Sequence, residues 1–327
     1  MHNRPNLSIQ RMILAPMEGV LDGIVRGLLT ELNQIDYCVT EFVRVTQQRL
    51  PKKVFYRLCP ELYQQGKTAS GSPVRVQLLG QHPALMAENA ALAAELGSYG
   101  IDINAGCPAK TVVGNQGGAC LLKTPELIYQ ITRQVRQAVP QNLPVSVKIR
   151  LGWADKSHCF EIADAVAQGG ATEIAIHGRT KEDGYRADKI DWQTIGLIKQ
   201  KLTIPVIANG EIFSPEDAQT CIVQSHCQDL MLARGVLQIP NLANVIRLHE
   251  APLAWSKTAQ LLLSYAQTEF DPELLLNKPF YHSARIKQWL TYLKGYYPQA
   301  TELLQQVRTT KTQQQMVERL LQYCEPG

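Results

Sequence analysis

One cysteine stands in a sequence context that favours chemistry over packing. Cys107 follows the strand-like run 100–104 in the string NAGCP, and a glycine-rich loop comes shortly after it. An isolated cysteine is usually a small core residue, because free thiols bury readily. Here Gly106 lets the backbone approach a ligand closely, and Pro108 stiffens the chain after the thiol. The pattern predicts a reactive thiol on a constrained loop.

A lysine inside an apolar run is the second candidate. Lys148 lies between Val147 and Ile149 in the run 145–149. Burying an ammonium group without a partner is costly. We therefore expect Lys148 to meet an anionic or electron-rich ligand, with a structural salt bridge as the alternative.

The elements that must position these residues form a regular series. Short β-branched runs alternate with amphipathic stretches of helical length, which predicts parallel βα units. Eight such units predict an α/β fold with a closed (β/α)8 TIM barrel, and an open doubly wound sheet is the alternative. Thr124 and Ser214, each followed by Pro-Glu, are expected to cap two of the helices. The expected strands are 12–17, 37–43, 74–79, 100–104, 145–149, 173–177, 205–209 and 229–233.

The pattern changes near residue 255, where strands disappear and only helical segments follow. These segments are expected at 257–267, 281–294, 298–308 and 312–323. We predict an N-terminal tail (1–11), a catalytic barrel (12–250) and a smaller all-α helical domain (251–327).

Polar residues gather at the expected strand ends, which meet at one mouth of such a barrel. The loops after strands seven and eight contain glycine, and the second adds Arg234, so they fit a phosphate-binding cradle. Together with Gln77 and Lys148 they fit flavin mononucleotide (FMN). The strand-end residues are Pro16, Met17, Glu18, Gln77, Asn104, Cys107, Lys148, His177, Asn209, Gly210, Glu211, Ala233 and Arg234.

Composition narrows the class of protein. The chain has 327 residues, 45% of them hydrophobic and 19% charged, which is ordinary for a globular protein. Its eight cysteines form no C-x-x-C pair, and although Cys221 and Cys227 flank His226, no second ligand pair follows. We therefore expect reduced thiols and no metal site. Neither a signal peptide nor a membrane span is evident, so we expect a cytoplasmic protein without membrane contact.

The C-terminal segment is more basic than the rest. Between residues 278 and 311 there are six Lys or Arg residues and a single acidic residue, Glu302, whereas the whole chain has a net charge of +4. Arg285 and Lys287 lie beside Trp289, and basic groups among aromatic rings suit RNA. The alternative is a solvated helix face with Trp289 in the core.

The string Asn104-x-Gly-Cys-Pro, followed by Lys110 and the glycines at 117 and 118, resembles the signature of the tRNA-dihydrouridine synthases. The resemblance extends from APMEGVLD to RIKQWL. It implies an FMN-binding barrel followed by a helical tRNA-binding domain, and reduction of a tRNA uridine with NADPH. It also implies Cys107 as the catalytic acid and FMN contacts from Pro16, Met17, Glu18, Gln77, Lys148, His177, Asn209, Gly210, Glu211, Ala233 and Arg234.

Three further strings, VTEFVRVT, GYR and ARIKQW, are most similar to the bacterial C subfamily, which acts on the D-loop uridine at tRNA position 16. Ala233 departs from the family pattern, which has glycine there, so a methyl group stands beside the expected phosphate. The tRNA contacts implied by the resemblance are Arg44, Asn104, Tyr185, Arg285, Lys287, Tyr292 and Arg308. We expect the protein to bind its tRNA as a monomer.

Two other functions stay open. A flavin barrel enzyme that reduces a free pyrimidine or an enone would explain the barrel but not the basic C-terminal segment. A non-catalytic RNA-binding protein would leave Cys107 and Lys148 unexplained. Action at another tRNA position, 17 or 20, is a further alternative to position 16.

Overall fold

The computed structural model describes residues 9–114, 116–270 and 272–324. Within these ranges eight parallel strands follow one another around a closed barrel, and β1 pairs with β8 to complete it. The predicted TIM barrel is confirmed, and the open sheet is excluded. Residues 1–8 of the predicted N-terminal tail lie outside the described residues. The strands are β1 Arg11–Leu14, β2 Tyr37–Arg44, β3 Val74–Leu79, β4 Ile101–Ala105, β5 Val145–Arg150, β6 Glu173–His177, β7 Val206–Asn209 and β8 Asp229–Leu232.

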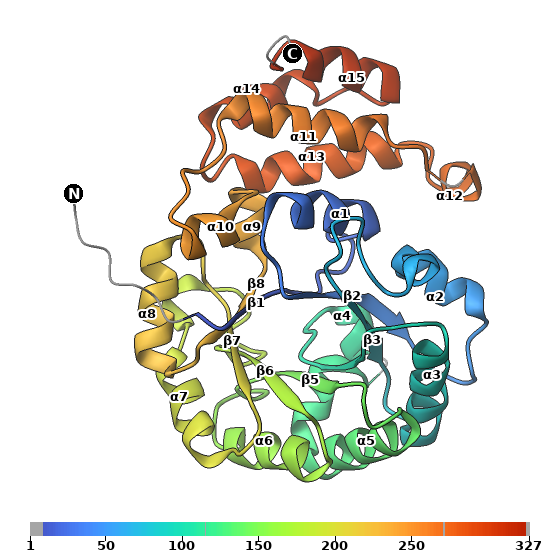
Figure 1. Cartoon of the computed structure of the whole chain (residues 1–327), viewed down its shortest axis with the longest axis vertical. Helices are drawn as coiled ribbons and strands as arrows, with labels where there is room; N and C mark the ends of the chain where they lie inside the picture. Colours follow the sequence, from blue (N-terminus) through green and yellow to red (C-terminus); the bar gives the residue numbers. More distant parts are fainter. Residues whose placement is uncertain (1–8, 115, 271, 325–327) are drawn as a thin grey trace.

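Helices surround the barrel on its outside (Figure 1). Ser214 caps α8 as predicted, because its hydroxyl accepts the N–H of Asp217 at 3.0 Å. Thr124 is the N-cap residue of α5 as predicted, with Pro125 and Glu126 in the first turn, but its side chain makes no capping hydrogen bond. The helices of this part are α1 Gly23–Leu32, α2 Lys52–Leu58, α3 Pro83–Glu95, α4 Lys110–Val113, α5 Pro125–Ala138, α6 Cys159–Gln168, α7 Trp192–Lys201, α8 Pro215–Ser225, α9 Arg234–Gln238 and α10 Leu242–Arg247, with short 3-10 turns at Pro60–Gln64, Gly118–Lys123 and Ala187–Lys189.

The alternation of side chains along each strand explains both the core and the site. In β5, Val145, Val147 and Ile149 are fully buried and belong to the large apolar core. Successive side chains of a strand point to opposite faces, so Ser146 and Lys148 face the interior of the barrel. The polar strand-end residues are therefore inward-facing positions.

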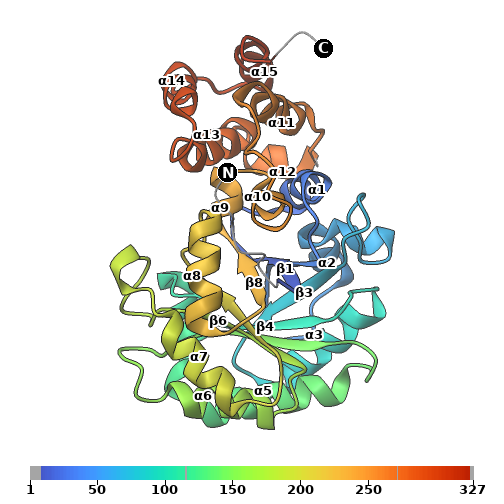
Figure 2. The same cartoon turned by 60° about the vertical axis from the view of Figure 1, so that its left-hand side comes forward.

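The C-terminal helices stack beside the barrel, above α1, α9 and α10 (Figures 1 and 2). Trp289 in α13 is buried and its indole N–H donates to the Leu237 carbonyl at 3.1 Å. Trp289 is thus a core residue, as the alternative interpretation expected, but the helix face beside it is not fully solvated, because Arg285 is buried as well. The predicted helical segments are confirmed, and α12 is an addition that the sequence did not predict. These helices are α11 Trp255–Gln267, α12 Pro272–Asn277, α13 Tyr281–Leu293, α14 Pro298–Gln306 and α15 Gln313–Leu321.

Among the described residues, no helix is both long enough and apolar enough to cross a bilayer.

Candidate active site

A cavity of about 750 Å³ lies at the carboxyl ends of the strands. Every residue that the sequence assigned to the cofactor lines it, together with Cys107, Asn104, Tyr185 and Tyr292. Tyr292 comes from α13, so the C-terminal helices contribute to the wall of a barrel cavity. The structure therefore brings the predicted strand-end residues into one place.

Cys107 lies on the loop after β4, with its side chain half-buried at the cavity wall. Asn104 Oδ1 accepts the backbone N–H groups of Gly106 at 3.1 Å and Cys107 at 2.9 Å, which fixes the loop. Burial raises the pKa of the Cys107 thiol, and a hydrogen bond from the Ala109 N–H offsets this only in part. The thiol stays protonated at neutral pH, which suits a proton donor.

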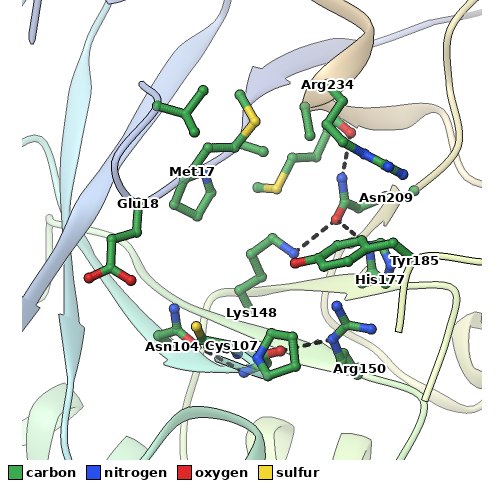
Figure 3. Close-up of a pocket in the computed structure, with 18 of the residues that line it drawn as sticks. Met17, Glu18, Asn104, Cys107, Lys148, Arg150, His177, Tyr185, Asn209 and Arg234 are labelled. Carbon is green, nitrogen blue, oxygen red and sulfur yellow. Dashed lines mark hydrogen bonds between the residues drawn. The ribbon is translucent and has the colours of Figure 1, made fainter. Parts of the chain in front are cut away.

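Lys148 borders the cavity and is otherwise enclosed by protein. This desolvation, with the nearby charge of Arg150, lowers the pKa of Lys148 to about 8. Its ammonium group donates to Asn209 Oδ1 at 2.8 Å, and the Asn209 amide donates to the Met231 carbonyl at 2.8 Å (Figure 3). Lys148 is thus a cation at neutral pH that is held at a fixed place in the wall.

His177 shares the Asn209 oxygen with Lys148, at 3.1 Å from its Nδ1 (Figure 3). Burial and the charges of Arg150 and Lys148 hold the pKa of His177 well below its usual range, so the ring is neutral. Because Asn209 Oδ1 can only accept, Nδ1 carries the hydrogen and Nε2 is an acceptor. His177 Nε2 is buried and, among the described residues, has no hydrogen-bond partner.

Glu211 is committed to two arginines. Its carboxylate accepts from Arg179 at 2.5 Å and from Arg234 at 3.1 Å. The Arg234 guanidinium also lies over the rings of Tyr185 and Phe213, with centroids at 5.1 and 5.5 Å. Glu211 therefore neutralises part of the positive charge in the expected phosphate cradle. Glu18 is exposed on the other side of the cavity (Figure 3).

The residues assigned to tRNA fall into two groups. Asn104, Tyr185 and Tyr292 line the cavity, and Tyr185 is 55% exposed. Arg44 lies nearby, with its guanidinium 3.4 Å from the carbonyl of Thr111 in α4. Tyr185 is thus the most accessible ring of this group, whereas Asn104 is buried and hydrogen-bonded within the protein.

The other group lies outside the cavity wall. Arg285 is only 9% exposed and contacts Asp22 and Tyr265. The Lys287 ammonium donates to the carbonyls of Arg308 at 3.1 Å and Thr310 at 2.6 Å. The Arg308 side chain is exposed. None of Arg285, Lys287 and Arg308 lines the cavity itself, but the Arg285 guanidinium donates to the carbonyl of Val20, which does.

Sequence reasoning missed Arg150, which lines the cavity. Arg150 donates to the carbonyls of Gly106 at 2.9 Å and Gly184 at 3.0 Å, and its guanidinium lies 5.1 Å from the Tyr185 ring centre. It therefore ties the Cys107 loop to the loop of Tyr185. The signal was present, because Arg150 continues the inward alternation of Ser146 and Lys148.

The chemistry of the wall fits the flavin that the sequence implied. An enclosed ammonium group, a neutral histidine with an unpaired acceptor nitrogen and a partly exposed arginine can hold an electron-rich ring and an anionic tail. Within the described residues, no group of three or more His, Cys, Asp or Glu side chains is arranged to hold a metal ion.

Sequence comparison places the chain among known proteins. The family model described as "Dihydrouridine synthase (Dus)" matches residues 13–325. The tRNA-dihydrouridine(16) synthase of Pasteurella multocida is 62% identical over 91% of this chain and 95% of that protein. The proteins of the same name from Haemophilus influenzae and Escherichia coli K12 are 57% and 58% identical, over 95% and 91% of this chain and 99% and 93% of theirs.

Comparison with solved structures shows the fold alone. The old yellow enzyme homologue of Zymomonas mobilis has a TM-score of 0.52 at 12% identity, over 75% of this chain and 90% of that one. Histamine dehydrogenase from Rhizobium sp. 4-9 has a TM-score of 0.57 at 12% identity, over 73% of this chain and 46% of that one. The family model and the sequence relatives, which cover nearly the whole chain, are decisive: the chain belongs to the dihydrouridine synthase family.

Proposed function

We propose that this protein is an FMN-dependent oxidoreductase that reduces uridine 16 in the D-loop of tRNA to dihydrouridine, with NADPH as the electron donor. The observation that carries the proposal is the placement of a protonated Cys107 thiol in the same cavity as Lys148, His177 and Asn209. The relatives named tRNA-dihydrouridine(16) synthase support position 16.

The flavin, when bound, supplies a hydride to C6 of the uracil ring. Cys107 then gives the proton from its Sγ to C5, which its raised pKa permits at neutral pH. The Cys107 thiolate that remains recovers a proton from solvent at the open mouth. The reaction needs the protonated thiol, because a thiolate in the resting enzyme would have no proton to give.

Lys148 and His177 are the residues we assign to the flavin ring. The Lys148 ammonium stabilises negative charge beside it, and His177 Nε2 accepts a hydrogen bond. Arg234 and the loop of Gly210 are assigned to the phosphate tail. The remaining proposed flavin contacts are Pro16, Met17, Glu18, Gln77, Asn209, Glu211 and Ala233.

The uridine must leave its stack to reach the cavity, which costs least in an unpaired loop. Tyr185 offers a half-exposed ring at the mouth, flanked by Arg150 and Arg234, and such rings support bases by stacking. We propose tRNA contacts from Arg44, Asn104, Tyr185, Arg285, Lys287, Tyr292 and Arg308, with 12–250 as the catalytic domain and 251–327 as the tRNA-binding domain. A monomer in the cytoplasm is part of the same proposal.

The test is dihydrouridine mapping at single-nucleotide resolution, on bulk tRNA from cells with and without the protein. Loss at position 16 alone is the expected result. Loss at position 17 or 20 would keep the reaction and change the proposed orientation of the tRNA. No loss at any position would overturn the proposal and redirect the search to a free pyrimidine.

A further inference from the structure

A buried carboxylate stands behind the Cys107 loop. Asp102 in β4 is 0% exposed and is not among the residues that line the cavity. Its Oδ1 accepts a hydrogen bond from the Ser146 hydroxyl at 2.6 Å, and its Oδ2 accepts one from the Gln77 amide at 2.7 Å. The proposed reaction assigns no role to Asp102, and these two hydrogen bonds offset the cost of burying its carboxylate.

A chain of hydrogen bonds connects Asp102 to the reactive loop. Gln77 Oε1 accepts from Asn104 Nδ2 at 2.8 Å. Asn104 Oδ1 in turn accepts the N–H groups of Gly106 at 3.1 Å and Cys107 at 2.9 Å. Two amide side chains therefore separate the Asp102 carboxylate from the backbone of Cys107.

The direction of this chain is fixed at both ends. Backbone N–H groups only donate, so Asn104 must turn its oxygen to the loop and its nitrogen to Gln77. Gln77 must then turn its oxygen to Asn104 and its nitrogen to Asp102, and an ionised carboxylate only accepts. The two amides are thus held in a single orientation, although an amide in isolation can rotate freely between two.

We propose that Asp102 is a positioning residue for Cys107. By accepting from Gln77 it fixes the orientation of the Gln77 and Asn104 amides, and through them the loop that holds the thiol in the cavity wall. The inference rests on the proposed function only for the role of Cys107 as proton donor. The positioning itself is a property of the resting protein.

The first test measures the loop without any substrate. In the FMN-loaded protein, alkylation of Cys107 by iodoacetamide is followed by mass spectrometry, and amide hydrogen exchange is followed over residues 104–107. Asp102→Val removes the acceptor and keeps much of the volume, so only Asn104 still holds the Gln77 amide and the orientation of both amides is less firmly fixed. We expect both rates to rise by about threefold or more, and Asn104→Ala to give the same change.

Two matched variants separate positioning from packing. Asp102→Asn keeps an amide oxygen that can accept from Gln77, so it should retain the alkylation and exchange rates of the wild type. Ser146→Ala removes the other partner of the same carboxylate and leaves the link to Gln77 intact, so it should do the same. An Asp102→Val protein with wild-type rates at Cys107 would overturn the proposal. If this variant does not fold, Asp102→Ala, which adds no methyl groups, answers the same question.

The second test measures turnover. Misplacement of the thiol should lower kcat by about 10- to 100-fold in Asp102→Val, with KM for tRNA unchanged. A rise in KM with unchanged kcat would contradict a role at Cys107. The two proposals can fail separately. A wild-type protein that does not reduce tRNA would overturn the proposed function. The first test would still decide the positioning role, because alkylation and hydrogen exchange need no tRNA.

Discussion

The Arg285 guanidinium in α13 lies 3.1 Å from the Asp22 carboxylate, so one ion pair joins the C-terminal helices to the loop after β1. The hydroxyl groups of Tyr265 and Tyr281 donate to the same oxygen at 3.0 and 3.3 Å. The other oxygen of Asp22 caps α1 by accepting the N–H of Val25 at 3.0 Å. Asp22 therefore fixes the loop that carries Met17 and Glu18 into the cavity.

Arg285→Ala should weaken FMN binding in the absence of tRNA, because it releases this loop. Loss of one partner of a mostly buried ion pair should also lower the free energy of unfolding by about 3 kcal/mol. Isothermal titration with FMN and thermal unfolding measure both effects. Arg285→Lys keeps the charge but not the planar fork, so its FMN affinity and stability should lie between those of the wild type and of Arg285→Ala. If Arg285 only contacted RNA and did not also support this loop, FMN binding would stay unchanged and only tRNA affinity and its salt dependence would fall.

Cys107→Ala should retain FMN and tRNA binding and lose turnover by about 100- to 10,000-fold, because it removes only the proton donor. Single-turnover oxidation of the reduced flavin by tRNA measures the step directly. Cys120→Ala is the matched control, since Cys120 is also half-buried but hydrogen-bonds to the Val113 carbonyl. Equal rates in the two variants would remove Cys107 from the reaction.

Lys148 should make the stability of the FMN-free protein depend on pH above 8. Its pKa is about 8 in the folded protein and near 10.5 when unfolded, so between these values the unfolded chain binds more protons. Stability should rise with pH in this window, relative to Lys148→Met, which lacks the titrating group. Urea unfolding at pH 7 to 10.5 tests this. If the difference in the free energy of unfolding between the two proteins did not change with pH, Lys148 would not be desolvated.

Bound FMN should remove that pH dependence, because an anionic ligand favours the charged lysine. The same unfolding series with saturating FMN measures this. If Lys148 does not contact the flavin, the pH dependence of stability will be the same with and without FMN.

Arg308→Ala should weaken tRNA binding and reduce the slope of log K against log salt by about 0.7 to 0.9, as loss of one phosphate contact predicts. Arg133→Ala is the control, since Arg133 is exposed on α5, on the far side of the barrel from the C-terminal helices (Figure 1). Filter binding at several salt concentrations gives both slopes. Equal slopes for the two variants would exclude a phosphate contact at Arg308.

The barrel was predictable because its signal is local. Each strand is a short β-branched run, and inward polar residues such as Lys148 and His177 interrupt these runs at the strand ends. The rule that parallel strand ends meet at one mouth then assembles the cavity without further knowledge.

What the sequence did not predict depends on contacts between distant residues. Arg285 is separated from Asp22 by 263 positions, and nothing in its own helix indicates that it is buried. Asp102 gave a local signal, an acidic residue between Ile101 and Ile103, which is the same kind of interruption that marked Lys148. Its partners could not be predicted, because they depend on the register of β4 against β3 and β5.

The pairing of β1 with β8 has a consequence for synthesis on the ribosome. Arg11 of β1 donates to Asp229 of β8 at 2.7 Å, across 218 residues of sequence. One edge of the first strand therefore stays unpaired until most of the chain has left the ribosome. Contacts so distant in sequence also form slowly. Tyr292 and Arg285 emerge later still, so the nascent protein can acquire a complete cofactor pocket only at the end of translation.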